Sequence, residues 1–150
     1  MTHSSPLIVL TTDFSTESGR AYTPTVELCR KLDGRILLLH VVESTAITPH
    51  GAPLAPVQLP PDTSAMVHAA KTRMAEEVQK LGTSVHVQPL VLDGIDVART
   101  VAEVAREHGA SFIATSTHGR SGLRRLVLGS VAEALVRHAS VPVICFPIAH

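Results

Sequence analysis

Residues 36–42 read Ile36-Leu37-Leu38-Leu39-His40-Val41-Val42, and residues 7–10 read Leu7-Ile8-Val9-Leu10. Apolar runs of this length are typical of strands that are buried on both faces of a parallel sheet. Residues 85–91, 111–115 and 141–146 also fit strands, and helical patterns occupy residues 15–32, 63–81, 97–108 and 130–138. Strands that alternate with helices form parallel crossovers. We therefore predict one α/β domain over residues 1–150: an open, doubly wound, Rossmann-like sheet of five parallel strands, in the order 3-2-1-4-5, with helices on both faces.

Prolines and helix-end residues refine this prediction. Pro24 interrupts the first helical pattern, so this helix either kinks there or begins near Thr23. Pro89 suits an edge strand, because no hydrogen bond of the ladder is lost there. Asp96 can cap the helix that follows it. Gly34 is the residue type usually found just past a helix end, so it predicts the end of the first helix.

Composition excludes several classes of protein. The chain has 150 residues, of which 45% are hydrophobic and 3% aromatic, and its formal net charge is zero. It therefore lacks the basic excess of nucleic-acid-binding proteins. The two cysteines, Cys29 and Cys145, lie in apolar patterns, as buried thiols of a reducing compartment do. No signal peptide is visible and no apolar run could cross a bilayer. We expect a soluble cytoplasmic protein that binds neither nucleic acid nor membrane.

The ends of three predicted strands are the places to look for a ligand site. In doubly wound sheets, ligands bind beyond the carboxyl ends of the strands, where the strand order reverses. Here those ends are Thr11 to Asp13, Val41 to Glu43, and Thr115 onward. At the first of them, Asp13 can contact a ligand or simply cap the helix near Ser15.

The segment from Ser116 to Ser130 carries the strongest local signal. Gly119 and Gly122 let the backbone turn and approach a ligand, and Ser130 with Glu133 has the spacing of a capping box. A helix that begins at Ser130 would present N–H groups to an anion such as phosphate. On spacing alone, an ordinary loop followed by a capped helix explains this segment as well as an anion-binding site does. The chain has no Walker A pattern, no GxGxxG fingerprint after the first strand, and no histidine spacing typical of a metal site.

The same segment resembles the signature of the universal stress protein family. That signature is carried by Gly119, nine further residues, and Gly129-Ser130, after the strand at residues 112–115. The Thr12-Asp13 turn and residues 39–42 and 141–143 are similar to the other family motifs, so the resemblance covers nearly the whole chain. The family has a five-stranded parallel sheet and commonly forms dimers. One of its branches binds ATP and another does not.

The resemblance implies a set of nucleotide-binding residues. Asp13 and Val41 match positions around the adenine, and Thr11 and Thr12 precede Asp13, with Thr11 at a place where the family often has proline. The ribose- and phosphate-binding signature and its neighbours correspond to Ser116, His118, Gly119, Arg120, Ser121, Gly122, Gly129, Ser130 and Val131. Ser116 replaces the first glycine of that pattern. The implied cofactor is ATP, with magnesium as an optional companion that is held mostly by phosphates and water.

Two functions follow from this assignment. In the first, the protein is a stress-response module that binds an adenine nucleotide, as a sensor or at most a slow ATPase. In the second, it is an ATP-independent interaction protein of the same fold, which Ser116 favours. An adenylating or nucleotide-hydrolysing enzyme is a weaker third interpretation, because no catalytic constellation is visible and His118 stands alone.

Two segments bear on partners. The last predicted strand, Val141 to Phe146, is apolar and suits a sheet edge, so we expect a homodimer through it; alternatively, residues 147–150 cover the edge in a monomer. The Pro- and Gly-rich stretch from Thr45 to Asp62 is either an interaction surface or a tolerated surface loop.

Overall fold

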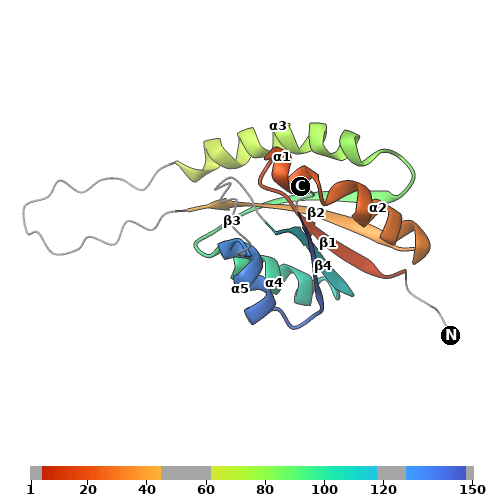
Figure 1. Cartoon of the computed structure of the whole chain (residues 1–150). Helices are drawn as coiled ribbons and strands as arrows, with labels where there is room; N and C mark the ends of the chain where they lie inside the picture. Colours follow the sequence, from red (N-terminus) through yellow and green to blue (C-terminus); the bar gives the residue numbers. More distant parts are fainter. Residues whose placement is uncertain (1–4, 45–61, 118–127, 148–150) are drawn as a thin grey trace, which may run out of the picture.

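A computed structural model describes residues 5–44, 62–117 and 128–147 of the chain. These residues form a single parallel sheet with helices packed on both of its faces (Figure 1). In chain order the elements are β1 (Leu7–Thr11), α1 (Thr16–Gly19), α2 (Tyr22–Lys31), β2 (Arg35–Glu43), α3 (Thr63–Leu81), β3 (His86–Gly94), α4 (Val97–Glu107), β4 (Phe112–Ser116), α5 (Ser130–His138) and β5 (Val143–Phe146). None of the described helices is long and apolar enough to cross a membrane.

The sheet has the predicted order β3-β2-β1-β4-β5, and every pair of neighbours is parallel. β1 is central, since Ile8 pairs with Ile36 of β2 on one side and with Phe112 of β4 on the other. The strand order reverses between β1 and β4. At such a point the connections leave the sheet in opposite directions, so a crevice opens at the carboxyl ends of the strands.

Two hydrophobic cores lie on opposite faces of the sheet, because successive side chains of a strand point to opposite sides. Ile8 and Leu10 of β1 pack with Met74 in the core under α2 and α3. Leu7 and Val9 pack with residues such as Leu135 in the core under α4 and α5. Both faces of β1 are therefore buried, as its continuous apolar run predicts.

The first helical pattern forms two helices instead of one. α1 ends at Gly19, and α2 begins at Tyr22, which places Pro24 in its first turn. A proline is tolerated there because the first N–H groups of a helix have no partner within the helix. Of the two alternatives, the late start is the correct one, and Pro24 causes no kink in the middle of a helix.

The end of α2 differs from the expectation based on Gly34. Asp33, not Gly34, adopts the positive φ, at 52°. The glycine is required by a close approach instead, since a Cβ atom at residue 34 would lie 2.8 Å from the carbonyl oxygen of Pro6. By contrast, Asp96 caps α4 as predicted, with its carboxylate accepting from the Arg99 N–H at 3.0 Å.

β3 and β5 are the two edges of the sheet. Pro89 lies in β3, opposite Leu38 of β2, so its missing N–H falls on an edge strand as expected. β3 extends three residues beyond the predicted end at Val91, because its ladder with β2 continues to Gly94. β5 begins at Val143 instead of Val141. Of the stretch from Thr45 to Asp62, residues 45–61 lie outside the described residues, and Asp62 caps α3.

Candidate functional site

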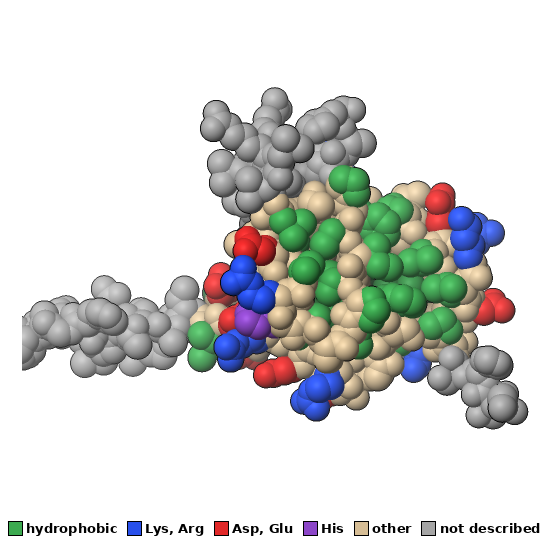
Figure 2. Space-filling model, turned by 60° about the horizontal axis from the view of Figure 1, so that its bottom comes forward, with side chains coloured by type: hydrophobic (Ala, Val, Ile, Leu, Met, Phe, Trp, Pro, Cys, Tyr) green, Lys and Arg blue, Asp and Glu red, His purple; other side chains and the backbone are tan. Residues whose placement is uncertain are grey.

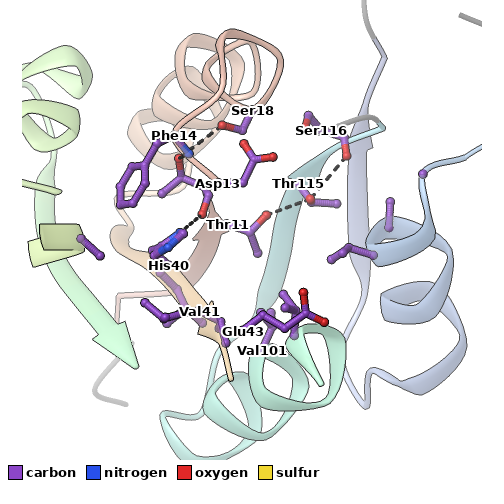
Figure 3. A pocket seen from close by; sticks show the side chains of 18 of the residues that line it. Thr11, Asp13, Phe14, Ser18, His40, Val41, Glu43, Val101, Thr115 and Ser116 are labelled. Carbon is purple, nitrogen blue, oxygen red and sulfur yellow. Dashed lines mark hydrogen bonds between the residues drawn. The ribbon is translucent and has the colours of Figure 1, made fainter. Parts of the chain in front are cut away.

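A cavity of about 680 Å³ opens at the carboxyl edge of the sheet, where the order of strands reverses (Figure 3). This volume is typical of a small-molecule site. The ends of β1, β2 and β4 meet there with the first two turns of α4, the first turn of α5 and one face of α3. The lining residues are Thr11, Thr12, Asp13, Phe14, Ser18, Leu39, His40, Val41, Val42, Glu43, Met66, Ala69, Ala70, Arg73, Val97, Val101, Thr115, Ser116, Thr117, Gly129, Ser130, Val131 and Ala132.

The turn after β1 forms one side of the cavity and presents a carboxylate. Asp13 Oδ1 accepts from the backbone N–H of Ser15 at 2.9 Å and from the Ser15 hydroxyl at 2.5 Å. Ser15 in turn caps α1 by accepting from the N–H of Ser18 at 3.1 Å. The two interpretations of Asp13 are therefore compatible, since its carboxylate supports the start of α1 and lies at the cavity.

Phe14 holds a strained conformation in the same turn. Its φ is 65°, in the left-handed region that bulky residues rarely adopt. Its ring lies 4.1 Å from the His40 ring, centroid to centroid, and the Arg73 guanidinium stands 4.8 Å from its centroid. Arg73 also donates to the Phe14 carbonyl at 3.3 Å. His40 Nδ1 lies 2.7 Å from the Thr12 carbonyl, so this nitrogen carries a proton, because a carbonyl only accepts.

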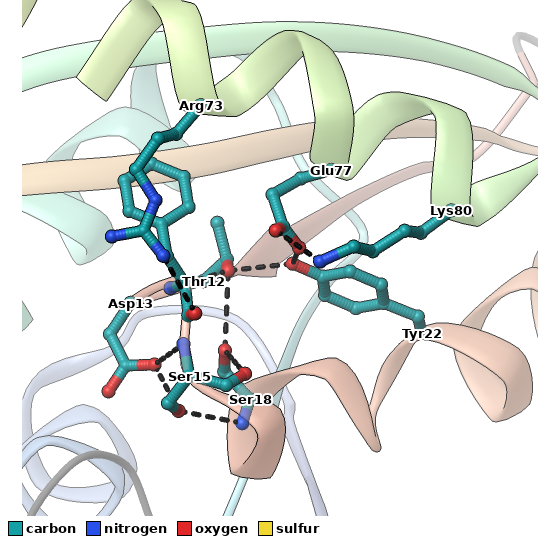
Figure 4. Close-up of polar contacts among 9 residues, drawn as sticks. Thr12, Asp13, Ser15, Ser18, Tyr22, Arg73, Glu77 and Lys80 are labelled. Carbon is teal, nitrogen blue, oxygen red and sulfur yellow. Dashed lines mark hydrogen bonds and ion pairs between the residues drawn. The ribbon is translucent and has the colours of Figure 1, made fainter. Parts of the chain in front are cut away.

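Behind the turn lies a buried polar network that joins Thr12, directly after β1, to α2 and α3 (Figure 4). The Tyr22 hydroxyl lies 2.7 Å from Thr12 Oγ1 and 2.6 Å from Glu77 Oε2, and Lys80 Nζ donates to Glu77 Oε1 at 2.6 Å. Burial, followed by the bond to Glu77, raises the pKa of Tyr22. The phenol is therefore neutral at physiological pH.

The start of α5 forms the opposite side of the cavity and differs from the predicted capping box. Gly129 is the N-cap, without any side-chain hydrogen bond, and Ser130 is already the first helical residue. Glu133 instead accepts from Arg137 at 2.8 Å. Gly129 N–H donates to the Thr117 carbonyl at 2.7 Å, which holds this end of α5 beside β4. The N-cap residue of α5 thus contributes no side-chain cap to the first-turn amides, which is a feature of anion-binding helix starts.

Ser116, which replaces the first signature glycine, is the last residue of β4 and is 7% exposed. Among the described residues other than glycine, only Phe14 and Asp33 have a positive φ. A serine therefore fits this position without backbone strain, since a strand conformation is open to any residue.

The structure brings eight of the predicted site residues to one cavity: Thr11, Thr12, Asp13, Val41, Ser116, Gly129, Ser130 and Val131. His118, Gly119, Arg120, Ser121 and Gly122 lie outside the described residues.

Sequence reasoning missed Phe14, His40 and Arg73. Phe14 and His40 adjoin predicted strand ends and could have been included on that ground. Arg73 lies in the middle of a long helix, where no local pattern marks it.

Comparison with known proteins agrees with this architecture. The model of the universal stress protein family matches residues 7–147. Universal stress protein MJ0531 of Methanocaldococcus jannaschii is 29% identical over 143 residues, which cover 91% of this chain and 79% of the relative.

Solved structures show the same fold. Universal stress protein UspA from Lactobacillus plantarum superposes with a TM-score of 0.74 at 24% identity, over 94% of this chain and 97% of that protein. The universal stress protein from Archaeoglobus fulgidus in complex with dAMP superposes with a TM-score of 0.66 at 19% identity, over 95% and 97%. Because the family match spans almost the whole chain, this protein belongs to the universal stress protein family.

Proposed function

We propose that this protein binds an adenine nucleotide, ATP, in the cavity at the carboxyl edge of the sheet, and that it acts as a sensor or regulatory module in a stress response. The observation that carries the proposal is that two chemically different parts of the chain line opposite sides of the cavity. One wall is the start of α5, where Gly129 is the N-cap and offers no side chain and Ser130 is the first helical residue. The other is the turn after β1 that presents Asp13, with Val41 near the end of the neighbouring strand β2.

The phosphates of the nucleotide would lie at α5. Its first-turn N–H groups and the positive end of its dipole favour an anion, and the exposed Ser130 hydroxyl adds a donor. The proposed phosphate site also includes Ser116 and Val131, together with His118, Gly119, Arg120, Ser121 and Gly122 from outside the described residues. A magnesium ion, where present, would be held mainly by phosphate oxygens and water.

The adenine would lie near Asp13 and Val41, with Thr11 and Thr12 beside it. Val41 with Val97 and Val101 of α4 gives an apolar surface on which a planar base can pack. The Archaeoglobus fulgidus relative was solved in complex with dAMP, which is an adenine nucleotide. That relative shares the fold with this chain, so its ligand supports the proposal by analogy only.

We assign no catalytic residue. We propose that hydrolysis of ATP is slow at most. The alternative is an ATP-independent interaction protein of the same fold. The observation that favours it is Ser116 in place of the first signature glycine, although the serine brings no strain to the backbone.

We also propose a homodimer of this single-domain protein through the edge strand β5. All four residues of β5, from Val143 to Phe146, are half-buried, and β4 is the neighbour of β5 in the described sheet. Nearby on α5, Val136 is 58% exposed. Figure 2 shows many hydrophobic side chains on the face that includes α4 and α5. Light scattering that finds a monomer at working concentration would contradict the dimer.

We propose that the protein lies in the cytoplasm, because its unpaired thiols, Cys29 and Cys145, suit a reducing compartment.

Titration calorimetry tests the nucleotide proposal. We expect ATP to bind with measurable heat and to raise the unfolding midpoint, since a ligand that binds only the native state adds about 2.7 kcal/mol at 100 times its Kd. GTP serves as the matched control for recognition of the base. A flat titration and an unchanged midpoint at millimolar ATP would eliminate the proposal and leave the ATP-independent alternative.

A further inference from the structure

α3 reaches the turn after β1 along two separate routes (Figure 4). In the first, Arg73 donates to the carbonyl of Phe14 at 3.3 Å and stacks its guanidinium against the ring of Phe14. In the second, Glu77 contacts the Tyr22 hydroxyl, which contacts Thr12. Arg73 and Glu77 are one helical turn apart. Arg73 contacts Phe14 directly and Glu77 contacts Thr12 through Tyr22, so both residues next to Asp13 are held by α3.

The protons of the second route can be assigned from chemistry. A phenol has a single O–H, so Tyr22 cannot donate to both of its neighbours. A carboxylate paired with a lysine only accepts, so Tyr22 donates to Glu77 and accepts from the Thr12 hydroxyl. Thr12 Oγ1 in turn accepts from the backbone N–H of Phe14 at 3.1 Å. The result is a directed chain of hydrogen bonds from the Phe14 amide to the Glu77 carboxylate, with the Ser18 hydroxyl as a side contact 3.3 Å from Thr12 Oγ1.

This chain of hydrogen bonds is buried, and one of its ends is the strained residue Phe14. Thr12 is 6% exposed, Tyr22 4% and Glu77 4%, so each of these polar groups needs its partner. Phe14 at a φ of 65° persists only when its surroundings hold it. The bonds to its amide and its carbonyl are the two that trace back to α3.

We infer that Tyr22 and Glu77 are positioning residues for nucleotide binding, because they fix the turn at Thr12 and Phe14 and thereby the direction in which Asp13 faces the cavity. Arg73 holds the same turn from the other side. The inference rests on the proposed function, in which Asp13 meets the adenine. It assigns these residues an effect on the base end of the ligand and none on the phosphate end at α5.

The test compares two ligands in the variant Tyr22→Phe, which removes one oxygen atom from the chain. ATP carries both the base and the phosphates, whereas tripolyphosphate carries only the phosphate end. We expect Tyr22→Phe to weaken ATP about tenfold, the scale of one lost buried hydrogen bond, and to change the affinity for tripolyphosphate less than about twofold. The matched control is Val104→Ala, a buried position of the other core that does not line the cavity, which should leave both affinities within twofold.

A second measurement needs no ligand. We expect the amide hydrogen of Phe14 to exchange at least about tenfold faster in Tyr22→Phe than in the wild type or in Val104→Ala, because Thr12 loses its 2.7 Å bond to the Tyr22 hydroxyl and keeps the longer contact with the Ser18 hydroxyl, at 3.3 Å. If Tyr22→Phe does not fold, Arg73→Ala breaks the other route at an exposed side chain, and the same loss of ATP affinity is expected.

The outcomes separate this inference from the proposed function. Equal losses of affinity for ATP and for tripolyphosphate, or an unchanged ATP affinity in a folded Tyr22→Phe variant, would overturn the inference that Tyr22 and Glu77 position the turn. If the wild type does not bind ATP, the proposed function fails. Exchange at Phe14 then decides alone whether α3 positions the turn, and an unchanged rate would refute that too.

Discussion

The hydroxyl of Thr11 donates to the hydroxyl of Thr115 at 2.8 Å, and this bond joins β1 to β4 at the point where the strand order reverses. Thr115 in turn lies 3.4 Å from the Ser116 carbonyl, to which it can donate. The two threonines therefore connect the two strands whose ends form the floor of the cavity.

Replacement of Thr115 by valine should destabilise the protein by about 1–2 kcal/mol, because the valine keeps the shape and removes a partly buried hydrogen bond. Urea unfolding of Thr11→Val, Thr115→Val and the double variant forms a cycle that isolates the bond. The double variant should lose less than the sum of the single losses. Strictly additive losses would show that the two hydroxyls do not interact in solution.

Replacement of Gly34 by alanine should destabilise the protein by about 1–3 kcal/mol, as overpacking does. The new Cβ atom would lie 2.8 Å from the Pro6 carbonyl oxygen, which is backbone and cannot move aside cheaply. Gly19→Ala is the matched control, since its Cβ would meet nothing within 4 Å. Thermal unfolding of the two variants tests this; equal midpoints would mean that the Gly34 contact is relaxed in solution.

The fold could be predicted from the sequence because its signals are local. Runs such as Leu7 to Leu10 can be buried only between two layers of helices, and the edge position of Pro89 follows from its missing N–H. The N-cap of α5 was predicted wrongly, because the Ser130/Glu133 spacing of a capping box places it at Ser130, whereas the structure has it one residue earlier, at Gly129. A spacing alone does not decide between neighbouring residues at a helix end.

Some residues of the candidate site could likewise be predicted from the sequence, and others could not. Asp13 and Val41 follow from the rule for strand ends, and the structure brings them to one cavity with Ser116 and Gly129. Arg73 and Glu77 approach the turn from a helix more than fifty residues away in the chain. A contact of this kind depends on how α3 is rotated about its axis, which a single amphipathic sequence fixes only loosely.

Tyr22 gives a direct optical test of the buried network, since it is the only tyrosine of the chain. Its pKa is raised in the folded protein by burial and by Glu77. It therefore stabilises the native state fully below the unfolded pKa of about 10, and that contribution is lost as the pH rises above this value. We expect little tyrosinate absorbance in folded protein at pH 10 to 10.5, and a normal titration near pH 10 in denaturant.

Tyr22→Phe should remove the loss of stability that ionisation of Tyr22 causes as the pH rises above about 10. Burial also raises the pKa values of Cys29 and Cys145, so these thiols contribute a separate loss above their ordinary pKa, at lower pH than the tyrosine does. A Cys29→Ala, Cys145→Ala background isolates the tyrosine. Reversible ionisation of Tyr22 near pH 10 in protein that remains folded would mean that the hydroxyl is not sequestered with Glu77.

Ser130→Asp should change stability and nucleotide affinity in opposite directions. A carboxylate in the first turn of α5 interacts favourably with the helix dipole, by about 0.3–1 kcal/mol, so the free energy of unfolding should rise or stay level. The same charge would repel phosphate from the adjacent amides, so the affinity for ATP should fall at least about tenfold, as expected for like charges a few ångströms apart. Ser130→Asn has nearly the same shape without the charge and should lose much less affinity. Calorimetry and urea unfolding on the three proteins measure both quantities. If Ser130→Asp binds ATP as the wild type does, the phosphates do not lie at the start of α5, and the nucleotide would have to enter the cavity in another orientation.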